Sequence, residues 1–317
     1  MKPSPQRPYH GIIPPLVTPL SGSDELDEPG LKKLIDHLCD GEVHGLFILG
    51  TTGEAPSLSH PLRRKMIEHS CKFTEGRLPI LVGITDTSFI ESVELAHHAA
   101  KCGADAVVVA PPYYLPPGQP ELLEYLNDLI AELPLPCMLY NMPPLTKVQI
   151  GSRVVEQLLD NQGIVGLKDS SGDMSYFHHI ENIAHQAGKW SVLMGSELLM
   201  MDSVLSGGDG GVTGGANLFP RFFSAAYQAA ASGDLDSVQQ MQKTMIHLQQ
   251  LYSIGQHASA GIKGIKCALE IVGICSTRMA EPFRRFEMPE KQSVHNLLNG
   301  LRKDPLLTKD FASLDQF

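Results

Sequence analysis

Lys168 is the residue in this sequence whose surroundings most favour covalent chemistry. It directly follows the apolar run 164–167, so it stands at the end of a buried segment. A lysine beside apolar residues usually packs its stem and extends its amine to solvent. In a closed pocket, desolvation instead favours the neutral amine, which is the form that attacks a carbonyl carbon. We therefore take Lys168 as a candidate Schiff-base lysine.

Tyr140 is a candidate for the proton transfers that a Schiff base requires. It ends a second apolar run, 136–140, so its ring would be buried and its hydroxyl would reach the rim. Thr51 and Thr52 lie in the turn Gly50–Glu54, between two glycines. A threonine hydroxyl there can hydrogen-bond the tyrosine and pass protons, and the backbone N–H groups of such a turn can hold a carboxylate.

Short apolar runs at regular intervals predict the elements that position these side chains. The runs are rich in Val, Ile and Leu, are bounded by Gly or Pro, and are too short for helices, as is typical of parallel strands buried on both faces. Eight of them alternate with helical patterns, which predicts an α/β chain folded as a (β/α)₈ barrel. A doubly wound open sheet is the alternative, but no G-x-G-x-x-G follows the first run. The runs start at Gly11, Gly45, Pro79, Asp105, Pro136, Gly163, Ser191 and Asp209.

The intervening segments carry the apolar stripes of amphipathic helices. Two clear examples are the stripes Leu31, Leu34, Ile35, Leu38 and Leu122, Leu126, Leu129, Ile130. Strand signals stop after residue 233, and helical patterns follow at 234–254, 261–275 and 290–302. We therefore divide the chain into a barrel domain, residues 1–233, and a C-terminal helical region, residues 234–317. Methionines on the first of these helices are expected in the core or at a subunit interface.

Active sites of such barrels lie at the carboxyl ends of the strands, so the residues that end each run are further candidates. Strand four runs into Pro111-Pro112-Tyr113-Tyr114, and strand seven into Gly195-Ser196-Glu197. The stretch Gly207–Gly215, which contains Val212, has no Lys or Arg beside it at a strand end. Its glycines are therefore better explained by crowding of the backbone than by a phosphate site.

Composition excludes several other classes of function. The formal net charge of −10 disfavours a nucleic-acid partner. The six cysteines show no Cys-x-x-Cys and predict free thiols, while the polar N-terminus and the lack of a long apolar run predict a cytoplasmic protein without membrane spans. The adjacent pairs His97-His98 and His178-His179 point about 100° apart on a helix, so no metal site is expected from them.

These motifs, in this order, resemble the dihydrodipicolinate synthase / N-acetylneuraminate lyase family over nearly the whole chain. The resemblance is carried by Gly50–Glu54, by 111–114, by Tyr140-Asn141-Met142-Pro143 and by Gly166-Leu167-Lys168-Asp169. It implies a homotetrameric class I aldolase that joins pyruvate, or another 2-keto acid, to an aldehyde without metal or organic cofactor, through an imine on Lys168. Tyr140 would be the acid/base, Thr52 would link it to Tyr114 of a neighbouring subunit, and Thr51 and Thr52 would hold the keto-acid carboxylate. Further substrate-binding candidates are Gly195, Ser196, Glu197 and Val212.

The choice of aldehyde is where the sequence departs from the best-known members. The synthases carry an arginine soon after the Tyr-Asn-x-Pro motif, whereas this chain has Leu145, with Lys147 nearby. Leucine cannot pair with a carboxylate. The sialate lyases have two consecutive acidic residues after strand seven, and this chain keeps Glu197 alone. We therefore expect a hydroxy-2-keto acid aldolase or a lyase of the N-acetylneuraminate type. The synthase reaction, a sugar-acid dehydratase and a non-catalytic keto-acid sensor are the alternatives.

Overall fold

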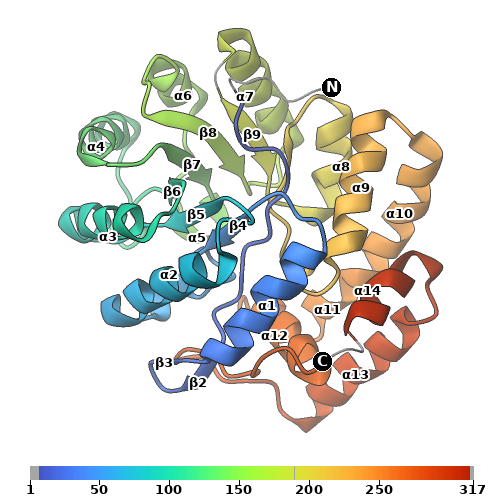
Figure 1. Cartoon of the computed structure of the whole chain (residues 1–317). Coiled ribbons are helices and arrows are strands. Elements are labelled where there is room, and N and C mark those ends of the chain that lie inside the picture. Colours follow the sequence, from blue (N-terminus) through green and yellow to red (C-terminus); the bar gives the residue numbers. More distant parts are fainter. Residues whose placement is uncertain (1–6, 189, 315–317) are drawn as a thin grey trace.

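The computed structural model describes residues 7–188 and 190–314, and within them the predicted strands form one parallel sheet (Figure 1). Each strand starts inside its predicted apolar run, and every strand residue except Val165 is buried. The strands are β1 (Gly11–Ile12), β4 (Leu46–Ile48), β5 (Ile80–Gly83), β6 (Ala106–Val109), β7 (Cys137–Asn141), β8 (Ile164–Asp169), β9 (Ser191–Met194) and β10 (Gly210–Gly211).

The sheet closes into a barrel. Its strand order is β1-β10-β9-β8-β7-β6-β5-β4, which leaves β1 and β4 as the two ends. The segment after β1 joins them, because Leu16 N donates to Phe47 O over 2.9 Å and Phe47 N donates to Pro14 O over 2.9 Å. An open sheet would leave both ends unpaired, so the (β/α)₈ prediction is confirmed and the doubly wound alternative is wrong.

Each strand is followed by a helix that packs on the outside of the barrel (Figure 1). Both predicted stripes are fully buried or nearly so, one on α1 and the other on α4. The helices are α1 (Glu28–Asp40), α2 (His60–Thr74), α3 (Phe89–Cys102), α4 (Gln119–Glu132), α6 (Ser152–Leu158), α7 (Met174–Ala187), α8 (Glu197–Leu205) and α9 (Pro220–Ser232). A one-turn helix, α5 (Pro143–Thr146), lies between β7 and α6.

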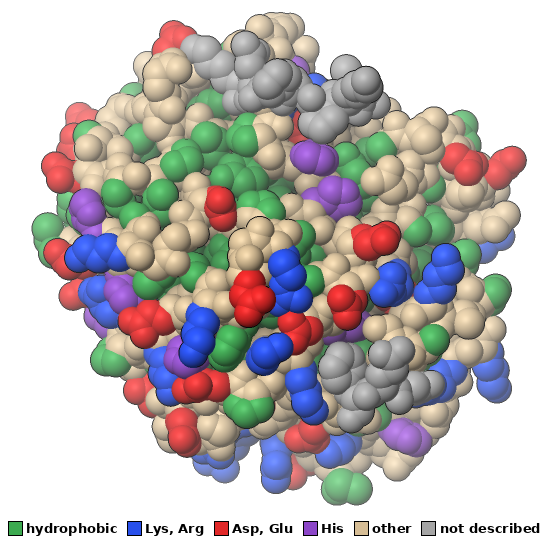
Figure 2. Space-filling model, in the orientation of Figure 1, with side chains coloured by type: hydrophobic (Ala, Val, Ile, Leu, Met, Phe, Trp, Pro, Cys, Tyr) green, Lys and Arg blue, Asp and Glu red, His purple; other side chains and the backbone are tan. Residues whose placement is uncertain are grey.

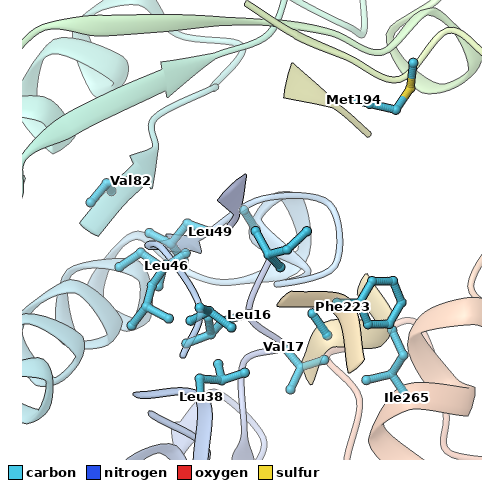
Figure 3. Close-up of a cluster of buried hydrophobic side chains, with 14 of the residues drawn as sticks. Leu16, Val17, Leu38, Leu46, Leu49, Val82, Met194, Phe223 and Ile265 are labelled. Carbon is cyan, nitrogen blue, oxygen red and sulfur yellow. The ribbon is translucent and has the colours of Figure 1, made fainter. Parts of the chain in front are cut away.

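Strand side chains alternate between two apolar cores, as a barrel requires. One core lies between the strands and the surrounding helices, and Figure 3 shows part of it, with Leu46 and Val82 of the sheet and Leu38 of α1 among the labelled side chains. The other fills the barrel interior. Its members are Tyr9, Ile13, Phe47, Leu81, Ala106, Val108, Ala110, Met138, Tyr140, Leu193 and Val212. Tyr140 therefore points into the barrel.

The glycines around residue 210 relieve crowding where the barrel closes. A Cβ atom on Gly210 would lie 2.0 Å from the carbonyl oxygen of Gly11 on the paired strand β1. Any larger residue would push the two strands apart. The structural explanation of this glycine-rich stretch is thus confirmed.

The segment after α9 is helical, as predicted, and Figure 1 shows it beside α1 and α9. It comprises α10 (Leu235–Leu248), α11 (Gln250–Ser253), α12 (Ala260–Ile271), α13 (Met288–Leu301) and α14 (Thr308–Leu314). Met245 of α10 is fully buried and Met241 packs against the core, as expected for core methionines. The helix α14 and the hairpin β2 (Leu20–Gly22) and β3 (Glu25–Leu26) were not predicted.

The face of the molecule drawn in Figure 2 carries acidic and basic side chains interspersed over its lower half. None of the helices in the described part of the chain has the length and apolarity needed to cross a bilayer. All six cysteines are free.

Candidate active site

Lys168 and Tyr140 face one another inside the barrel. They are register partners on the neighbouring strands β8 and β7, and both side chains point inward. The Nζ atom of Lys168 lies 3.8 Å from the centroid of the Tyr140 ring and 5.1 Å from that of Phe47. Lys168 is 5% exposed, so its amine is desolvated between two aromatic rings. The lysine is therefore buried inside the barrel and does not lie at the solvent surface.

The hydroxyl of Tyr140 is set up for proton transfer. It lies 3.3 Å from Oγ1 of Thr51. Burial raises the pKa of Tyr140, but the charge of Lys168 and the hydrogen bonds from Thr51, Lys168 and Ser170 outweigh burial, so that the pKa lies below its ordinary value of 10.0. A phenol that ionises more readily can release and recover a proton nearer neutral pH.

Thr51, and not Thr52, is the threonine beside Tyr140. The resemblance assigned the proton link to Thr52, and the hydrogen bond of the Tyr140 hydroxyl to Thr51 corrects that assignment. The two residues are adjacent in an irregular turn, where neighbouring side chains point in different directions. The backbone N–H groups of Thr51 and Thr52 make no hydrogen bond within the described residues, which leaves both free to bind an anion.

A buried polar network fixes the ends of β7 and β8 just beyond the reactive pair. Asn141 Nδ2 donates to Asp169 Oδ1 over 2.8 Å, and Asn141 Oδ1 accepts from Ile150 N over 3.0 Å. Ser171 Oγ donates to the other carboxylate oxygen over 2.8 Å. The sequence analysis gave these residues no role, although their place directly after Tyr140 and Lys168 was a usable signal.

Because Gly195 has no side chain, it leaves room for the hydroxyl of Ser170 near Tyr140. A Cβ atom on Gly195 would collide with Ser170 Oγ, and Ser170 is one of the groups that lower the pKa of Tyr140. Gly195 thus acts by leaving space, and Ser170 is a further residue whose role was not predicted from the sequence.

A cavity of 310 Å³, within the range of small-ligand sites, is lined by Tyr140 and Phe47, the two rings that Lys168 contacts, but not by Lys168 itself. Thr51, Tyr113 and Tyr140 contribute to its wall, and the loops after β4, β5, β6 and β7 supply most of the remainder. One side is formed by residues of the C-terminal region, which the sequence analysis did not anticipate. They are Ala258, Ser259, Ile262 and Phe283.

Other predicted substrate-binding residues do not reach this wall. Gly195, Ser196, Glu197 and Val212 are not among the lining residues. Val212 belongs to the barrel interior. The carboxylate of Glu197 is buried and engaged by protein groups: Tyr252 donates to it over 2.6 Å, Gln249 over 2.7 Å and Gly215 N over 2.5 Å. Glu197 therefore joins the barrel to α11, and it is not presented to a ligand.

Glu54 ends the Thr51–Glu54 turn and forms a buried ion pair with the C-terminal region. Its Oε1 atom lies 2.5 Å from Nζ of Lys266 on α12, and its Oε2 atom accepts from Ala280 N over 2.8 Å. Lys266 also donates to Arg278 O over 2.6 Å. The turn that carries Thr51 is thus held by the same segment that forms one side of the cavity.

No group of three or more potential metal ligands occurs among residues 7–188 and 190–314. The adjacent pairs His97-His98 and His178-His179 lie on α3 and α7.

Comparison with known proteins agrees with this geometry. The model of the dihydrodipicolinate synthetase family matches residues 8–301. A 4-hydroxy-tetrahydrodipicolinate synthase of Phenylobacterium zucineum is 32% identical, over 86% of this chain and 91% of that protein. A probable 2-dehydro-3-deoxy-D-pentonate aldolase of Escherichia coli is 30% identical, over 92% of this chain and 97% of that protein.

Structures of similar proteins carry the same fold. Dihydrodipicolinate synthase from Bacteroides thetaiotaomicron has a TM-score of 0.90 and 48% identity, over 92% of this chain and 99% of that one. The Escherichia coli protein YagE in complex with pyruvate has a TM-score of 0.87 and 30% identity, over 93% of this chain and 99% of that one. The fold, the buried lysine–tyrosine pair and these similarities confirm the resemblance: the chain belongs to the dihydrodipicolinate synthetase family and is a carbon–carbon lyase, an aldolase that acts through a Schiff base.

Proposed function

We propose that Lys168 forms the Schiff base with pyruvate or a close 2-keto acid, and that Tyr140 moves the protons. The observation that carries this proposal is the contact of the buried Lys168 amine with Tyr140, 3.8 Å from the ring centroid, beside an open cavity. The imine makes the substrate its own electron sink, so the reaction needs no metal or organic cofactor.

In the cleavage direction, the neutral Lys168 amine attacks the keto carbon of a 4-hydroxy-2-keto acid. The Tyr140 hydroxyl gives its proton to the departing hydroxyl group, so that water leaves and a protonated imine and the Tyr140 phenolate remain. The Tyr140 phenolate takes the proton of the 4-hydroxyl group, the C3–C4 bond breaks, and an aldehyde leaves. The electron pair moves into the imine, which becomes an enamine. Protonation of the enamine carbon and hydrolysis then release pyruvate and restore the amine.

Thr51 and Thr52 have separate roles in this proposal. The Thr51 hydroxyl holds the Tyr140 hydroxyl and passes protons outward, because it is the group in hydrogen-bond contact with it. The unpaired N–H groups of Thr51 and Thr52 bind the keto-acid carboxylate. The carboxylate then lies on the side of the cavity formed by the turn after β4.

Tyr114 completes the site from a neighbouring subunit of a homotetramer. Its side chain is 90% exposed, and the adjacent Leu115 is also exposed. Two such side chains on one loop suit a subunit contact better than open solvent. The free state of all six cysteines supports a reducing compartment, and we place the enzyme in the cytoplasm.

The physiological reaction proposed here is aldol cleavage of a hydroxy-2-keto acid. Relatives at about 30% identity include both synthases and aldolases, and synthases are the more frequent. Leu145 lines the cavity of this chain and cannot pair with the carboxylate of aspartate semialdehyde. This observation favours an aldolase over a synthase.

Product analysis with pyruvate and an aldehyde tests this assignment. An aldol adduct that Lys168→Ala cannot form supports it, and faster condensation with aspartate semialdehyde than with any other aldehyde would assign the synthase reaction instead. Loss of water from a sugar acid without carbon–carbon cleavage would indicate a dehydratase. Binding of pyruvate without any turnover would indicate a sensor.

A further inference from the structure

We propose that the cavity beside Tyr140 takes an aldehyde that is uncharged and mainly apolar, with an aliphatic or aryl chain. This inference rests on the proposed function and names the class of its second substrate. It is carried by the composition of the cavity wall, by the state of the polar groups in that wall, and by the place of the cations nearby.

Most of the accessible surface of the cavity wall belongs to apolar atoms. Met142 and Leu145 come from the loop after β7, and Val108 comes from β6. Ile262 of α12 and Phe283 close the side formed by the C-terminal region. Side chains from three separate parts of the fold thus present apolar groups to one space, which suits a chain that gains free energy on leaving water.

Two of the polar side chains at the wall are already engaged by the protein. Thr146 Oγ1 lies 3.1 Å from Met142 O and 2.9 Å from Val148 O, so its hydrogen is directed at the backbone. Glu54 binds Lys266 and the N–H of Ala280 with its two carboxylate oxygens. Neither side chain is therefore available to a substrate hydroxyl group without losing a buried hydrogen bond.

No lysine or arginine is among the residues that line the cavity in the described part of the chain. Besides Lys168, which contacts Tyr140 and Phe47 of the wall and forms the imine, two cations lie near the wall and are bound. Arg63 donates to Asp86 over 2.7 Å and to Leu58 O over 3.1 Å, and Lys266 is held by Glu54. A carboxylate on the aldehyde would lose its hydration on entering the cavity and would find no cationic partner there. This disfavours binding of acidic aldehydes.

The test compares aldehydes that differ in one group. The enzyme condenses pyruvate with 4-methylpentanal, with 4-oxobutanoate, which has the same number of non-hydrogen atoms, and with glyceraldehyde. Adduct formation is followed by mass spectrometry. We expect kcat/KM for 4-methylpentanal to exceed that for 4-oxobutanoate by roughly tenfold or more, the size of one missing charge-assisted hydrogen bond, and to exceed that for glyceraldehyde as well. Preference for 4-oxobutanoate or for glyceraldehyde would overturn the inference.

Leu145→Arg tests the wall directly. Leu145 is 45% exposed, so a longer charged side chain can be accommodated there without being buried. The variant should raise kcat/KM for 4-oxobutanoate and lower it for 4-methylpentanal, because the arginine supplies the missing cation. Leu145→Gln, polar but uncharged, is the control and should not favour the acidic aldehyde. Unchanged selectivity in Leu145→Arg would show that this wall does not contact the aldehyde.

Borohydride trapping of pyruvate on the same protein separates the two proposals. An adduct on Lys168 together with preference for an acidic or hydroxylated aldehyde refutes only the inference on the aldehyde. An adduct with no turnover of any aldehyde also refutes it, since the cavity then takes no aldehyde. Absence of the adduct in a folded protein refutes the proposed function.

Discussion

Replacement of Lys266 by methionine should destabilise the protein strongly, although the residue is distant from the reacting carbon. Lys266 is fully buried, and the side chain of Glu54 is 1% exposed. Methionine has nearly the same length, so the change removes the charge and leaves the packing largely intact. The Glu54 carboxylate would then keep only the N–H of Ala280 as a partner.

The magnitude follows from burial. Removing one partner of a buried ion pair typically costs about 3–5 kcal/mol, because the remaining charge is left desolvated and unpaired. Lys32 and Asp36 provide a comparison at nearly equal separation, 2.6 Å, with side chains 56% and 32% exposed. An exposed pair of this kind contributes only about 0.3–0.5 kcal/mol. The two pairs differ in burial and hardly in distance.

Urea unfolding followed by far-UV circular dichroism measures the difference. We expect Lys266→Met to lose about 3–5 kcal/mol, and the control Lys32→Met to lose less than ~1 kcal/mol. The double variant Lys266→Met/Glu54→Gln should recover part of the loss, because glutamine leaves no unpaired charge. Activity of Lys266→Met should also fall, since Glu54 holds the turn that presents Thr51 to Tyr140.

Equal losses in Lys266→Met and Lys32→Met would refute this reasoning. A double variant less stable than Lys266→Met would contradict it too, because the unpaired Glu54 carboxylate would then not be the source of the loss.

Three further predictions concern single side chains. Tyr140→Phe should lower kcat by roughly 10²–10⁴-fold while pyruvate still forms its adduct, and near-normal turnover would remove Tyr140 from the mechanism. Thr51 helps to lower the pKa of Tyr140, so Thr51→Val should raise that pKa and move the corresponding limb of the kcat/KM profile to higher pH, whereas Thr51→Ser should not; identical profiles for both variants would contradict this. Burial raises the pKa of Asp310 from 3.8 to about 6, although Arg221 N and Phe222 N donate to it. Between pH 3.8 and about 6, the Asp310 carboxyl therefore keeps its proton in the folded state and loses it in the unfolded state. The unfolding free energy should decrease by ~3 kcal/mol as pH rises through this range. Urea unfolding of Asp310→Asn at a series of pH values should not show that decrease. If the unfolding free energy of the variant depends on pH as in the unchanged protein, the decrease belongs to another group.

The strands and the reactive pair could be predicted because their signals are local. A strand buried on both faces must be a short apolar run, and Gly or Pro ends it. Lys168 and Tyr140 then follow from the rule that such barrels present their chemistry at the carboxyl ends of strands. The alternation of side chains along β7 and β8 turns both residues inward. Family resemblance added the roles of these residues.

The remainder of the site depends on contacts that no local pattern contains. Thr51 and Thr52 are neighbours of the same type, and only the dihedral angles of the turn decide which hydroxyl meets Tyr140. Glu197 has the type and position of a substrate ligand, but Gln249 and Tyr252, more than fifty residues later, occupy its carboxylate. A lysine inside an apolar helix, as at position 266, was the one overlooked signal for a buried ion pair.

The apolar wall also could not be predicted, because it combines loops of the barrel with residues that follow α11. Ile262 and Leu145 lie far apart in sequence and meet only when the C-terminal helices pack against the barrel. The hairpin of β2 and β3 was not predicted because its strands, of 3 and 2 residues, do not lie in an apolar run.

Incubation with pyruvate, reduction with borohydride and peptide mapping test whether Lys168 is the residue that forms the imine. We expect one reduced pyruvyl adduct per chain, located on Lys168, and none in Lys168→Ala. The other lysines of the same digest serve as internal controls. An adduct on a different lysine, or no adduct in a protein shown to be folded, would contradict the assignment of Lys168 as the Schiff-base residue.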